Sequence, residues 1–447
     1  MSIITTDQQK VVIGLGKTGY SVVAFFANKG ISVVVMDTRE EPPFAEAVRQ
    51  HYPQVELVLG GLNESILCGA SQVVLSPGLP LATPEIQAAI NSNVEVVGDI
   101  QIFSDYAKCP VVAITGSNAK STVTTLVGEM ARDAGLKVAI GGNLGTPALD
   151  LIEDDVELYV MELSSFQLET TPSLMASVAT VLNVSPDHLD RYDSYLHYHQ
   201  AKHKIFNGCK SVVVNRDDAL TAPMIKPGVP HVSFGLGKPD LNQFGIIEQD
   251  SNSYLSKFNQ PLLNVNELKI KGSHNRSNAL SALALGEIVG LSMESMINTL
   301  RHYPGLEHRC QWVGRHAGVD YFNDSKGTNV GASVAAMEGL GPEIQGEIVL
   351  MAGGVGKGAD FSFMQAAVNQ YVKTLVLYGE DKNILAQSLE GNAKILLAES
   401  FQDAFQLAKT NALDGDAVLL SPACASFDMF NSFEHRGDFF KQLVEAL

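Results

Sequence analysis

Val111-Val-Ala-Ile-Thr-Gly-Ser-Asn-Ala-Lys-Ser-Thr122 is the stretch of this chain that says most about its fold. Its β-branched beginning predicts a buried strand, the glycine-bearing turn that follows ends in Lys120 and Ser121, and a helix comes next. This order is typical of a phosphate loop, in which backbone amides hold phosphates, the lysine offsets their charge and the hydroxyl binds Mg²⁺. The strict pattern is not met, because Ile114 stands where a glycine belongs and Ala119 precedes the lysine. A Lys-Ser helix start that arose by chance is the alternative.

Strands and helices alternate over almost the whole chain. Besides the strand at 111–114, short β-branched runs occur at 11–13, 31–36, 73–75, 158–161, 178–182, 212–214, 348–351, 374–377 and 417–420. Helical stretches, many of them rich in alanine, lie between these runs. The alternation predicts an α/β protein with parallel, doubly wound sheets.

Two breaks in this pattern divide the chain. Residues 236–265 are polar and predict a small antiparallel meander, and Pro304-Gly305 ends a helix at what we interpret as an interdomain joint. A length of 447 residues corresponds to about three domains. We expect a Rossmann-like domain at 1–98, a central ATP-binding domain of the phosphate-loop type at 99–305, and a second Rossmann-like α/β domain at 306–447.

The composition excludes several classes of protein. With 45% hydrophobic and 18% charged residues, the chain is neither disordered nor fibrous. Its formal net charge of −18 repels nucleic acid and anionic membranes, so we expect neither as a partner. No 18 apolar residues run together and the N-terminus lacks the basic start of a signal peptide, which predicts a cytoplasmic protein. The five cysteines form no C-x-x-C pair, as is usual for reduced thiols.

A second glycine-rich turn, Gly14-Leu-Gly-Lys-Thr-Gly19, follows the first strand and opens a helix. Asp37 ends the next strand, where an acidic group usually accepts from a ribose hydroxyl. These features favour an NAD site, but another nucleotide diphosphate or plain packing of a tight turn would also account for them. Asp37-Thr-Arg39 and Ser76-Pro-Gly78 suggest a ligand with groups beyond those of NAD.

Acidic and imidazole side chains follow two further strands. Glu162 ends the strand at 158–161, and an acid beside a phosphate loop is where a Mg²⁺ ligand belongs. Asp187 and His188 follow the strand at 178–182 and are expected to reach the same crevice, although a lone histidine is more often structural. His199 and His203 have a spacing that can bind zinc, but no third ligand is evident, and a solvated helical face is the simpler interpretation.

In the last third, three polar loops follow predicted strands, at 323–329, 352–358 and 421–426. Ligands of open α/β sheets bind outside the carboxyl ends of the strands. The three loops together therefore predict one more anion site, with ordinary tight turns as the alternative for any single loop.

In this order, the motifs of the chain resemble those of the Mur ligase family over essentially its whole length. The most specific pieces are Val112-Ala-Ile-Thr-Gly-Ser-Asn118, Gly141-Gly-Asn-Leu-Gly145, Glu162-Leu-Ser-Ser-Phe-Gln-Leu-Glu-Thr170, Asp187-His-Leu-Asp-Arg-Tyr192, His274-Asn-Arg-Ser-Asn-Ala279, Asn323-Asp-Ser-Lys326 and Leu420-Ser-Pro-Ala-Cys-Ala-Ser426. The resemblance implies an ATP-dependent ligase that adds D-glutamate to UDP-N-acetylmuramoyl-L-alanine through an acyl phosphate, in peptidoglycan precursor synthesis. It replaces the NAD interpretation, because the N-terminal domain of this family binds the UDP of a sugar nucleotide.

The resemblance also implies roles for individual residues. The UDP substrate is assigned to Lys17, Thr18, Asp37, Thr38, Arg39, Ser76, Gly78, Asn143, Ser164 and His188. ATP is assigned to Gly116, Ser117, Asn118, Ala119, Lys120, Ser121, Thr122, Asn278, Arg309 and Asp324. D-Glutamate is assigned to Lys326, Thr328, Lys357, Ser426 and Phe427. Two Mg²⁺ ions are expected at Ser121, Glu162, His188 and Lys202, and the catalytic group comprises Lys120, Glu162, His188 and Lys202.

Two positions carry further expectations. Lys202 matches a lysine that members of the family carry as a carbamate, whose oxygens attract Mg²⁺ where an ammonium repels it. Ala119 replaces a glycine usual in the family, and a positive φ there would cost of order 1 kcal/mol. The general base stays unassigned. We expect a monomer whose C-terminal domain closes on ATP about a hinge near Pro304-Gly305.

Three rival functions stay open on the sequence alone. A nicotinamide-dependent oxidoreductase would use the first glycine-rich turn but would leave the phosphate loop and Glu162 without a role. A nucleotide-switched binding protein would hydrolyse ATP slowly and without regard to D-glutamate. Within the family, a ligase for another amino acid is the nearest alternative, because a few C-terminal contacts decide the acceptor.

Overall fold

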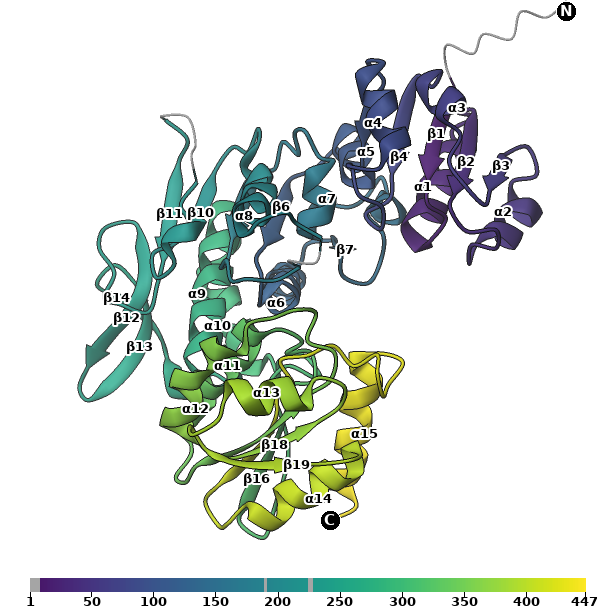
Figure 1. Cartoon of the computed structure of the whole chain (residues 1–447). Coiled ribbons are helices and arrows are strands. Elements are labelled where there is room, and N and C mark those ends of the chain that lie inside the picture. Colours follow the sequence, from purple (N-terminus) through teal and green to yellow (C-terminus); the bar gives the residue numbers. More distant parts are fainter. Residues whose placement is uncertain (1–8, 189–190, 224–227) are drawn as a thin grey trace, which may run out of the picture.

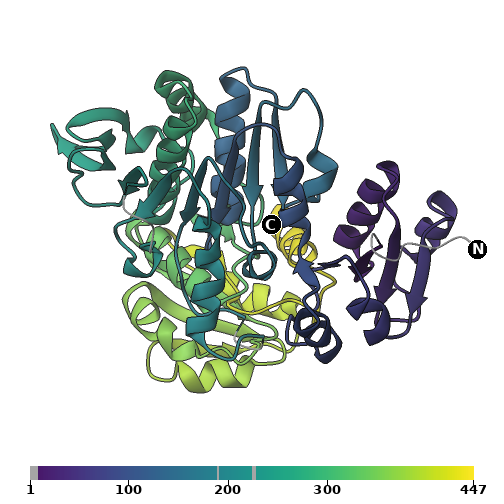
Figure 2. The same cartoon turned by 90° about the horizontal axis from the view of Figure 1, so that it is seen from above.

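Three β-sheets, each built from its own stretch of chain, make up the protein (Figure 1). The computed structural model describes residues 9–188, 191–223 and 228–447. Seen from above, the N-terminal body stands to one side of the other two (Figure 2). The predicted α/β architecture with three sheet-bearing bodies is confirmed.

The first sheet is entirely parallel, with the strand order β3-β2-β1-β4-β5. Its strands are β1 (Lys10–Ile13), β2 (Val33–Asp37), β3 (Glu56–Leu59), β4 (Gln72–Leu75) and β5 (Glu95–Val97). Its helices are α1 (Lys17–Asn28), α2 (Ala45–His51), α3 (Glu64–Cys68) and α4 (Pro84–Asn91). The chain leaves β1 toward β2 on one side and returns to β4 on the other. Such a switch point opens a crevice at the carboxyl ends of the strands.

The second sheet has nine strands in the order β14-β13-β12-β11-β10-β9-β6-β8-β7. They are β6 (Val111–Thr115), β7 (Val138–Gly142), β8 (Leu158–Glu162), β9 (Val178–Val181), β10 (Val212–Asn215), β11 (His231–Phe234), β12 (Gln243–Gln249), β13 (Asn252–Lys257) and β14 (Gln260–Asn264). The predicted antiparallel meander is present as β12 to β14. It is not a separate layer, because β12 pairs in parallel with β11 and so prolongs the main sheet.

Helices and short 3₁₀ turns connect these strands. They are α5 (Asp99–Tyr106), α6 (Lys120–Asp133), η2 (Ala148–Leu151), α7 (Ser165–Glu169), α8 (Tyr195–His203), η3 (Lys204–Phe206), η4 (Ala219–Thr221), η5 (Val265–Glu267), α9 (Ser273–Ile288) and α10 (Met293–His302). The helix α10 ends just before Pro304-Gly305, as the sequence predicts.

The third sheet has the order β15-β16-β20-β17-β18-β19, and only its edge strand is antiparallel. The elements are β15 (Gln311–His316), β16 (Val319–Asn323), α11 (Val330–Leu340), η6 (Gly341–Glu343), β17 (Ile348–Gly353), η7 (Phe361–Met364), α12 (Gln365–Tyr371), β18 (Val372–Tyr378), α13 (Lys382–Ser388), β19 (Lys394–Leu397), α14 (Phe401–Asn411), β20 (Ala417–Leu420) and α15 (Phe433–Glu445). The sequence did not predict the β15–β16 hairpin. Its two-residue turn has positive φ at Ala317 (49°) and Gly318 (80°), and alanine is not a usual residue for such a turn.

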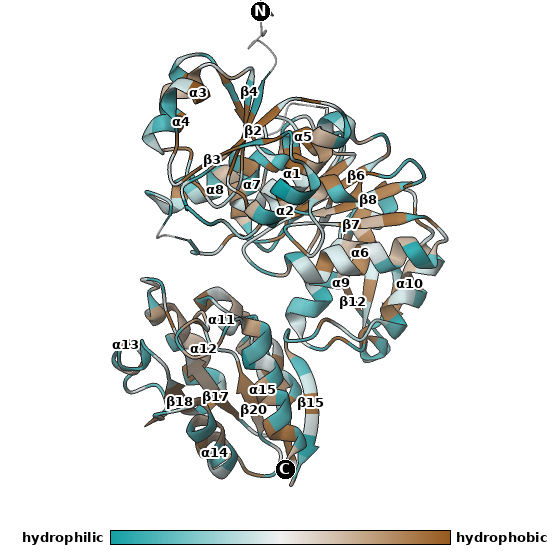
Figure 3. Cartoon of the chain, turned by 90° about the vertical axis from the view of Figure 1, so that its right-hand side faces the viewer, coloured by the Kyte–Doolittle hydropathy of each residue, from teal (hydrophilic) through white to brown (hydrophobic). Residues whose placement is uncertain are grey.

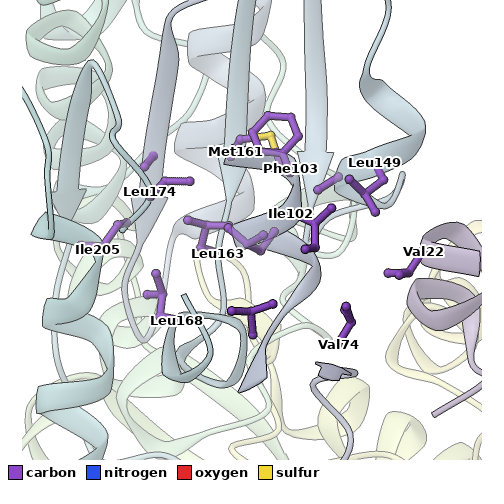
Figure 4. Close-up of a cluster of buried hydrophobic side chains, with 14 of the residues drawn as sticks. Val22, Val74, Ile102, Phe103, Leu149, Met161, Leu163, Leu168, Leu174 and Ile205 are labelled. Atoms are coloured by element: carbon purple, nitrogen blue, oxygen red, sulfur yellow. The ribbon is translucent and has the colours of Figure 1, made fainter. Parts of the chain in front are cut away.

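Apolar side chains concentrate on the strands inside the three bodies (Figure 3). One buried cluster runs from the first body into the second, from Val22 and Val74 to Ile102, Phe103 and Leu168 (Figure 4). The apolar clusters of the third body do not join it. The first two bodies therefore share a packed core, whereas the contacts described below between the second and third bodies are polar.

No helix of the described ranges combines the length and the apolar character needed to cross a membrane. All five cysteines are free thiols.

Candidate functional site

The phosphate loop lies between β6 and α6, as its sequence predicts. The Nζ atom of Lys120 curls back over the loop and donates to the carbonyl oxygens of Gly116 (2.8 Å) and Ser117 (3.0 Å). Burial lowers the pKa of Lys120, and the nearby Glu162 carboxylate opposes this shift. The loop thus presents a buried cation whose hydrogen bonds to its own carbonyls are available for exchange with an anionic ligand.

Ala119 has φ = 66° and ψ = −6°, which is the left-handed region, at the residue before α6. For a residue with a Cβ atom this conformation costs about 1–2 kcal/mol. The sequence analysis expected a cost at Ala119 if the backbone there had a positive φ. The backbone does have a positive φ at this alanine.

Asn183, at the end of β9, holds the phosphate loop in place. Its Oδ1 atom accepts from the backbone amide of Asn118 (2.8 Å), and its Nδ2 atom donates to the Asn118 carbonyl (3.2 Å). Its own carbonyl accepts from the amide of Ser117 (3.0 Å). Sequence reasoning gave Asn183 no role, although its position after a buried strand was a usable signal.

Glu162 ends β8 beside the loop and is buried. Asn143 Nδ2 donates to its Oε1 atom (2.7 Å), whereas Oε2 has no hydrogen-bond partner. Burial favours the protonated acid, but the Lys120 ammonium and the Asn143 amide hold the pKa below its ordinary value. The result is a buried carboxylate with one free oxygen, which is a donor that Mg²⁺ prefers.

Among the residues that the structure describes, no three His, Cys, Asp or Glu side chains gather as a ready-made metal site. A metal at this edge would therefore take few protein oxygens, such as those of Glu162 and Ser121, and complete its shell with phosphate and water. That is the usual mode of Mg²⁺ in nucleotide sites.

Lys202 and His188 approach the loop from the other side. Lys202 is only 2% exposed; its Nζ atom donates to the Gly116 carbonyl (2.9 Å) and lies 4.6 Å from the centre of the Tyr198 ring. Burial and the neighbouring Lys120 charge lower its pKa well below the ordinary value. His188 packs against Phe166, with ring centres 4.8 Å apart, and burial lowers its pKa as well.

Charged side chains of the third body complete this edge. Arg309 Nη2 and Lys326 Nζ both donate to the Ser121 hydroxyl, at 3.0 and 3.1 Å. Burial lowers the pKa of Lys326 to about 8. Behind them, burial raises the pKa of Asp324 to about 6, although Ser421 Oγ donates to its carboxylate (2.7 Å). Two cations therefore meet at the hydroxyl to which the sequence assigns a metal ion.

A cavity of about 140 Å³ lies between the second and third bodies at this point. It is lined by six of the ten residues assigned to ATP, namely Asn118, Ala119, Thr122, Asn278, Arg309 and Asp324, together with Asn183, His274, Lys326 and Gly327. Ligand pockets usually have volumes of about 300–1,000 Å³. The cavity is therefore small for a nucleotide in this arrangement of the bodies.

The crevice at the switch point of the first sheet has a volume of about 560 Å³. Of the residues assigned to the UDP substrate, it is lined by Lys17, Thr18, Asp37, Thr38, Arg39, Ser76, Gly78 and Asn143. Ser164 does not line it; its hydroxyl caps α7 by accepting from the Gln167 amide (3.2 Å). Gln167, which the sequence did not single out, lies in the crevice instead.

Asp37 has its carboxylate turned into the protein. Oδ2 accepts from the Leu15 amide (2.6 Å), and Oδ1 accepts from the amide and Nε of Arg39 (2.9 and 2.8 Å). These donors outweigh burial and hold the pKa of Asp37 below its ordinary value. Asp37 therefore orders the glycine-rich turn and orients Arg39 toward the crevice.

The residues assigned to D-glutamate fall into separate places. Thr328 and Lys357 line a cavity of about 360 Å³ between the second and third bodies, together with His188. Lys326 points instead to Ser121, Ser426 is buried, and Phe427 is 72% exposed. The structure thus brings two of the five residues together with His188, and places the other three elsewhere.

Arg436, on α15, is another residue that the sequence did not single out. It is fully buried and donates to both oxygens of Ser325 (3.0 and 2.8 Å) and to the Cys424 carbonyl (3.2 Å). Its Nη1 atom also makes a long hydrogen bond to the Gly353 carbonyl (3.5 Å), so Arg436 contacts all three loops that predicted an anion site. A lone arginine within a helix gives no sequence signal for this role.

Comparison with protein-family models gives matches over most of the chain. The model described as Mur ligase MurD-like, N-terminal domain, matches residues 8–98. The Mur ligase middle domain matches residues 114–286, and the Mur ligase, glutamate ligase domain, matches residues 308–424.

Curated relatives match over the full length. A protein of Pseudomonas savastanoi pv. phaseolicola, named UDP-N-acetylmuramoylalanine--D-glutamate ligase, is 56% identical over 447 residues, with all of both chains covered. The protein of the same name from Pseudomonas aeruginosa is 54% identical, again over both whole chains. Among solved structures, MurF from Acinetobacter baumannii matches with a TM-score of 0.63 at 17% identity, covering 97% of this chain and 90% of that one. MurC from Thermotoga maritima matches with a TM-score of 0.58 at 18% identity, covering 98% and 99%. The structural matches establish a shared fold.

Proposed function

This chain belongs to the Mur ligase family, and from that premise we propose that it is an ATP-dependent ligase that joins D-glutamate to UDP-N-acetylmuramoyl-L-alanine in peptidoglycan synthesis. The observation that carries the proposal most directly is the meeting of Lys120 and Ser121 with Arg309 and Lys326 at one edge of the central sheet. Acyl activation by ATP needs cations around the transferring phosphoryl group, and the two bodies supply them jointly.

The UDP-sugar substrate is placed in the crevice of the first sheet. The eight assigned residues that line it, and the length of the crevice from the glycine-rich turn to Asn143, support this placement. Asn143 bonds Glu162, so a substrate that reaches Asn143 has its far end beside the phosphate loop. Ser164 and His188 are proposed to meet that end of the substrate.

ATP is placed between the second and third bodies. The loop residues Gly116, Ser117, Asn118, Ala119, Lys120, Ser121 and Thr122 would surround its phosphates, with Asn278, Arg309 and Asp324 on the nucleotide side. The free Oε2 atom of Glu162 and the Ser121 hydroxyl are oxygen donors that fit Mg²⁺. We propose that these two residues, with His188 and Lys202, hold two Mg²⁺ ions, which would neutralise phosphate charge. Since Arg309 and Lys326 now donate to Ser121, ATP and metal binding require the third body to shift.

In the proposed reaction, the γ-phosphoryl group of ATP passes to the L-alanyl carboxylate, which leaves ADP and an acyl phosphate. The amine of D-glutamate then forms a C–N bond at the acyl carbon, and the tetrahedral intermediate expels phosphate. The amine loses a proton to a base that we leave unassigned. Lys120 offsets charge on the transferring group throughout.

D-Glutamate is proposed to bind Lys326, Thr328, Lys357, Ser426 and Phe427. Thr328 and Lys357 share a cavity with His188. This arrangement supports a contact between Lys357 and a carboxylate of D-glutamate, because an ammonium group suits a carboxylate. Phe427 and Ser426 lie outside that lining and would join only through movement of the C-terminal loops.

We propose that Lys202 is carbamylated. Carbamylation joins the carbon of CO₂ to the Nζ atom with loss of a proton, and needs a neutral amine. The lowered pKa of Lys202 increases the fraction of neutral amine at neutral pH, and its Nζ atom lies against the phosphate loop. Both observations support this step.

Domain limits of 1–98, 99–305 and 306–447 are proposed from the positions of the three sheets and the family matches. We also propose that the protein acts in the cytoplasm as a monomer, where its nucleotide and amino-acid substrates are found.

The test is phosphate release from ATP and Mg²⁺ in the presence of UDP-N-acetylmuramoyl-L-alanine, with and without D-glutamate. Release that requires both substrates is the expected result. Release with another amino acid in place of D-glutamate would identify a different acceptor. Release that is indifferent to any amino acid would contradict a ligase and indicate a nucleotide-switched ATPase, and an absorbance change with NAD(P)H would revive the oxidoreductase.

A further inference from the structure

Two histidines on α8 point at one atom. His199 Nε2 and His203 Nε2 lie 2.8 and 2.7 Å from the carbonyl oxygen of Leu220, and their ring centres are 4.1 Å apart. A carbonyl oxygen only accepts hydrogen bonds, so both Nε2 atoms carry a proton, and in the neutral form of each ring Nδ1 is then bare. The sequence favoured a solvated helical face for this pair. In the structure, both rings lie within hydrogen-bond distance of the same carbonyl oxygen.

We propose that His199 and His203 form a binding site for a borderline divalent transition metal such as Zn²⁺, separate from the site proposed for Mg²⁺. Imidazole nitrogen suits Zn²⁺, Ni²⁺ and Cu²⁺, whereas Mg²⁺ prefers oxygen. A zinc ion bound at about 2.0–2.1 Å from two nitrogens holds them within about 4 Å of each other. The two Nε2 atoms already approach one oxygen atom, at 2.8 and 2.7 Å. Metal entry moves the proton of each ring from Nε2 to Nδ1 and needs no net proton release.

The surroundings favour a cation at this point. Asp218 caps η4 with its carboxylate, and its charge acts on His203. Among the residues that the structure describes, Lys204 also lines the adjoining cavity, and its ammonium donates to the Glu169 carbonyl (2.8 Å).

There is also space for the remaining ligands. A cavity of about 530 Å³ adjoins both histidines and is further lined by Gln200, Asn207 and Cys209. Water in this cavity would complete a tetrahedral shell, and the Leu220 carbonyl offers a further oxygen. The site would tie α8, which carries Lys202 on its buried side, to the η4 turn, which contains Leu220. Its occupancy would therefore stabilise the helix that presents Lys202 to the phosphate loop.

The test is calorimetric titration of Zn²⁺ into the metal-stripped full-length protein with excess Mg²⁺, followed by the visible spectrum of the Co²⁺ form. His197 is a matched control, since it lies on the same helix, is exposed, and its Nδ1 atom lies 3.6 Å from the Asp193 carboxylate. We expect one equivalent of Zn²⁺ to bind wild type and His197→Ala alike. His199→Ala and His203→Ala should each weaken Zn²⁺ binding by at least roughly 10–100-fold. Loss of a residue that only hydrogen-bonds to a metal ligand already has an effect of that size, and these variants lose the ligand itself.

His203→Gln separates a loss of zinc binding from a folding defect. The glutamine amide can still donate to the Leu220 carbonyl, but it is a poor zinc ligand. The variant should keep the wild-type melting temperature in EDTA and lose the stabilisation that Zn²⁺ gives. Undiminished Zn²⁺ binding in both His199→Ala and His203→Ala would overturn the proposal. Binding that is lost in Cys209→Ser but kept in the histidine variants would overturn it as well, and would assign the metal to the thiol.

Discussion

Lys326 of the third body donates from Nζ to the Ser121 hydroxyl of the phosphate loop, at 3.1 Å, across the boundary between two domains that share no apolar cluster. A second cation, Arg309, makes the same contact. These side chains lie where the proposed function requires phosphate and metal. The polar contact is therefore one that ATP would replace, which fits movement of the third body about the joint after α10.

Lys326→Ala is expected to raise the KM for ATP and the KM for D-glutamate, each by roughly tenfold or more. A charge-assisted hydrogen bond contributes about 1.5–3 kcal/mol, and tenfold corresponds to about 1.4 kcal/mol. Steady-state kinetics with each substrate varied in turn measures both values. Lys357→Ala is the control and should raise the KM for D-glutamate alone. An unchanged KM for ATP in Lys326→Ala would show that the contact with Ser121 has no counterpart in the working enzyme.

Ala119→Gly should relieve the left-handed strain at φ = 66° and leave the KM for ATP unchanged or lower. Relief of about 1–2 kcal/mol is partly offset by the greater freedom of glycine in the unfolded chain, about 0.5–1 kcal/mol. Denaturant unfolding should therefore show equal or slightly higher stability. The matched control, Ala131→Gly at a buried position in the last turn of α6, should lower stability by about 1 kcal/mol. A large rise of the KM for ATP in Ala119→Gly would mean that the loop depends on alanine.

Asn183→Ala should raise the KM for ATP, because both side-chain bonds to Asn118 are lost and the loop amides are no longer held for phosphate. The expected loss is about 1–3 kcal/mol, or roughly 5- to 150-fold. Asn183→Asp should restore part of it, since a carboxylate still accepts from the Asn118 amide. ATP binding measured by titration, together with the KM for D-glutamate as internal control, checks this. Equal increases in both KM values would indicate general damage instead.

Asp99→Asn should remove a pH-dependent loss of stability at the joint between the first two bodies. Asp99 is buried, its Oδ1 atom has no partner, and burial raises its pKa from 3.8 to about 6. Below pH 3.8 the carboxyl group is protonated in both the folded and the unfolded protein, so its burial carries no charge penalty. Because the pKa is higher in the folded protein, the free energy of unfolding falls as the pH rises from 3.8 through about 6. At 1.36 kcal/mol per unit, the difference between variant and wild type should grow by about 2.4 kcal/mol in favour of the variant between pH 4 and pH 7.5. Unfolding midpoints across that range measure it, and a difference that does not change with pH would contradict the assignment.

Lys202→Ala should abolish most ligase activity, because it removes the proposed carbamate. Short carboxylic acids should partly restore it by supplying the missing oxygens. The control is Lys204→Ala, two positions along, whose ammonium bonds a distant carbonyl and should leave activity largely intact. Full activity of Lys202→Ala would remove the carbamate from the mechanism.

Much of the architecture was encoded locally. The strand–turn–helix order at 111–122, the β-branched runs and the break at Pro304-Gly305 each depend on neighbouring residues, so the sequence predicted three α/β bodies and the meander correctly. The β15–β16 hairpin was missed, because its turn lacks the usual Asn-Gly or Asp-Gly signal.

For the site, the sequence determined which loops follow strands, and hence that Lys120, Glu162 and the glycine-rich turn at 14–19 lie at carboxyl edges of sheets. Pairing between distant segments was decided only by tertiary structure. Lys202 gave no local signal, yet the fold buries it against Gly116, 86 positions away. Asn183 and Arg436 acquire their roles in the same way, because a hydrogen bond depends on where the backbone brings its two partners, and short-range patterns do not encode that distance.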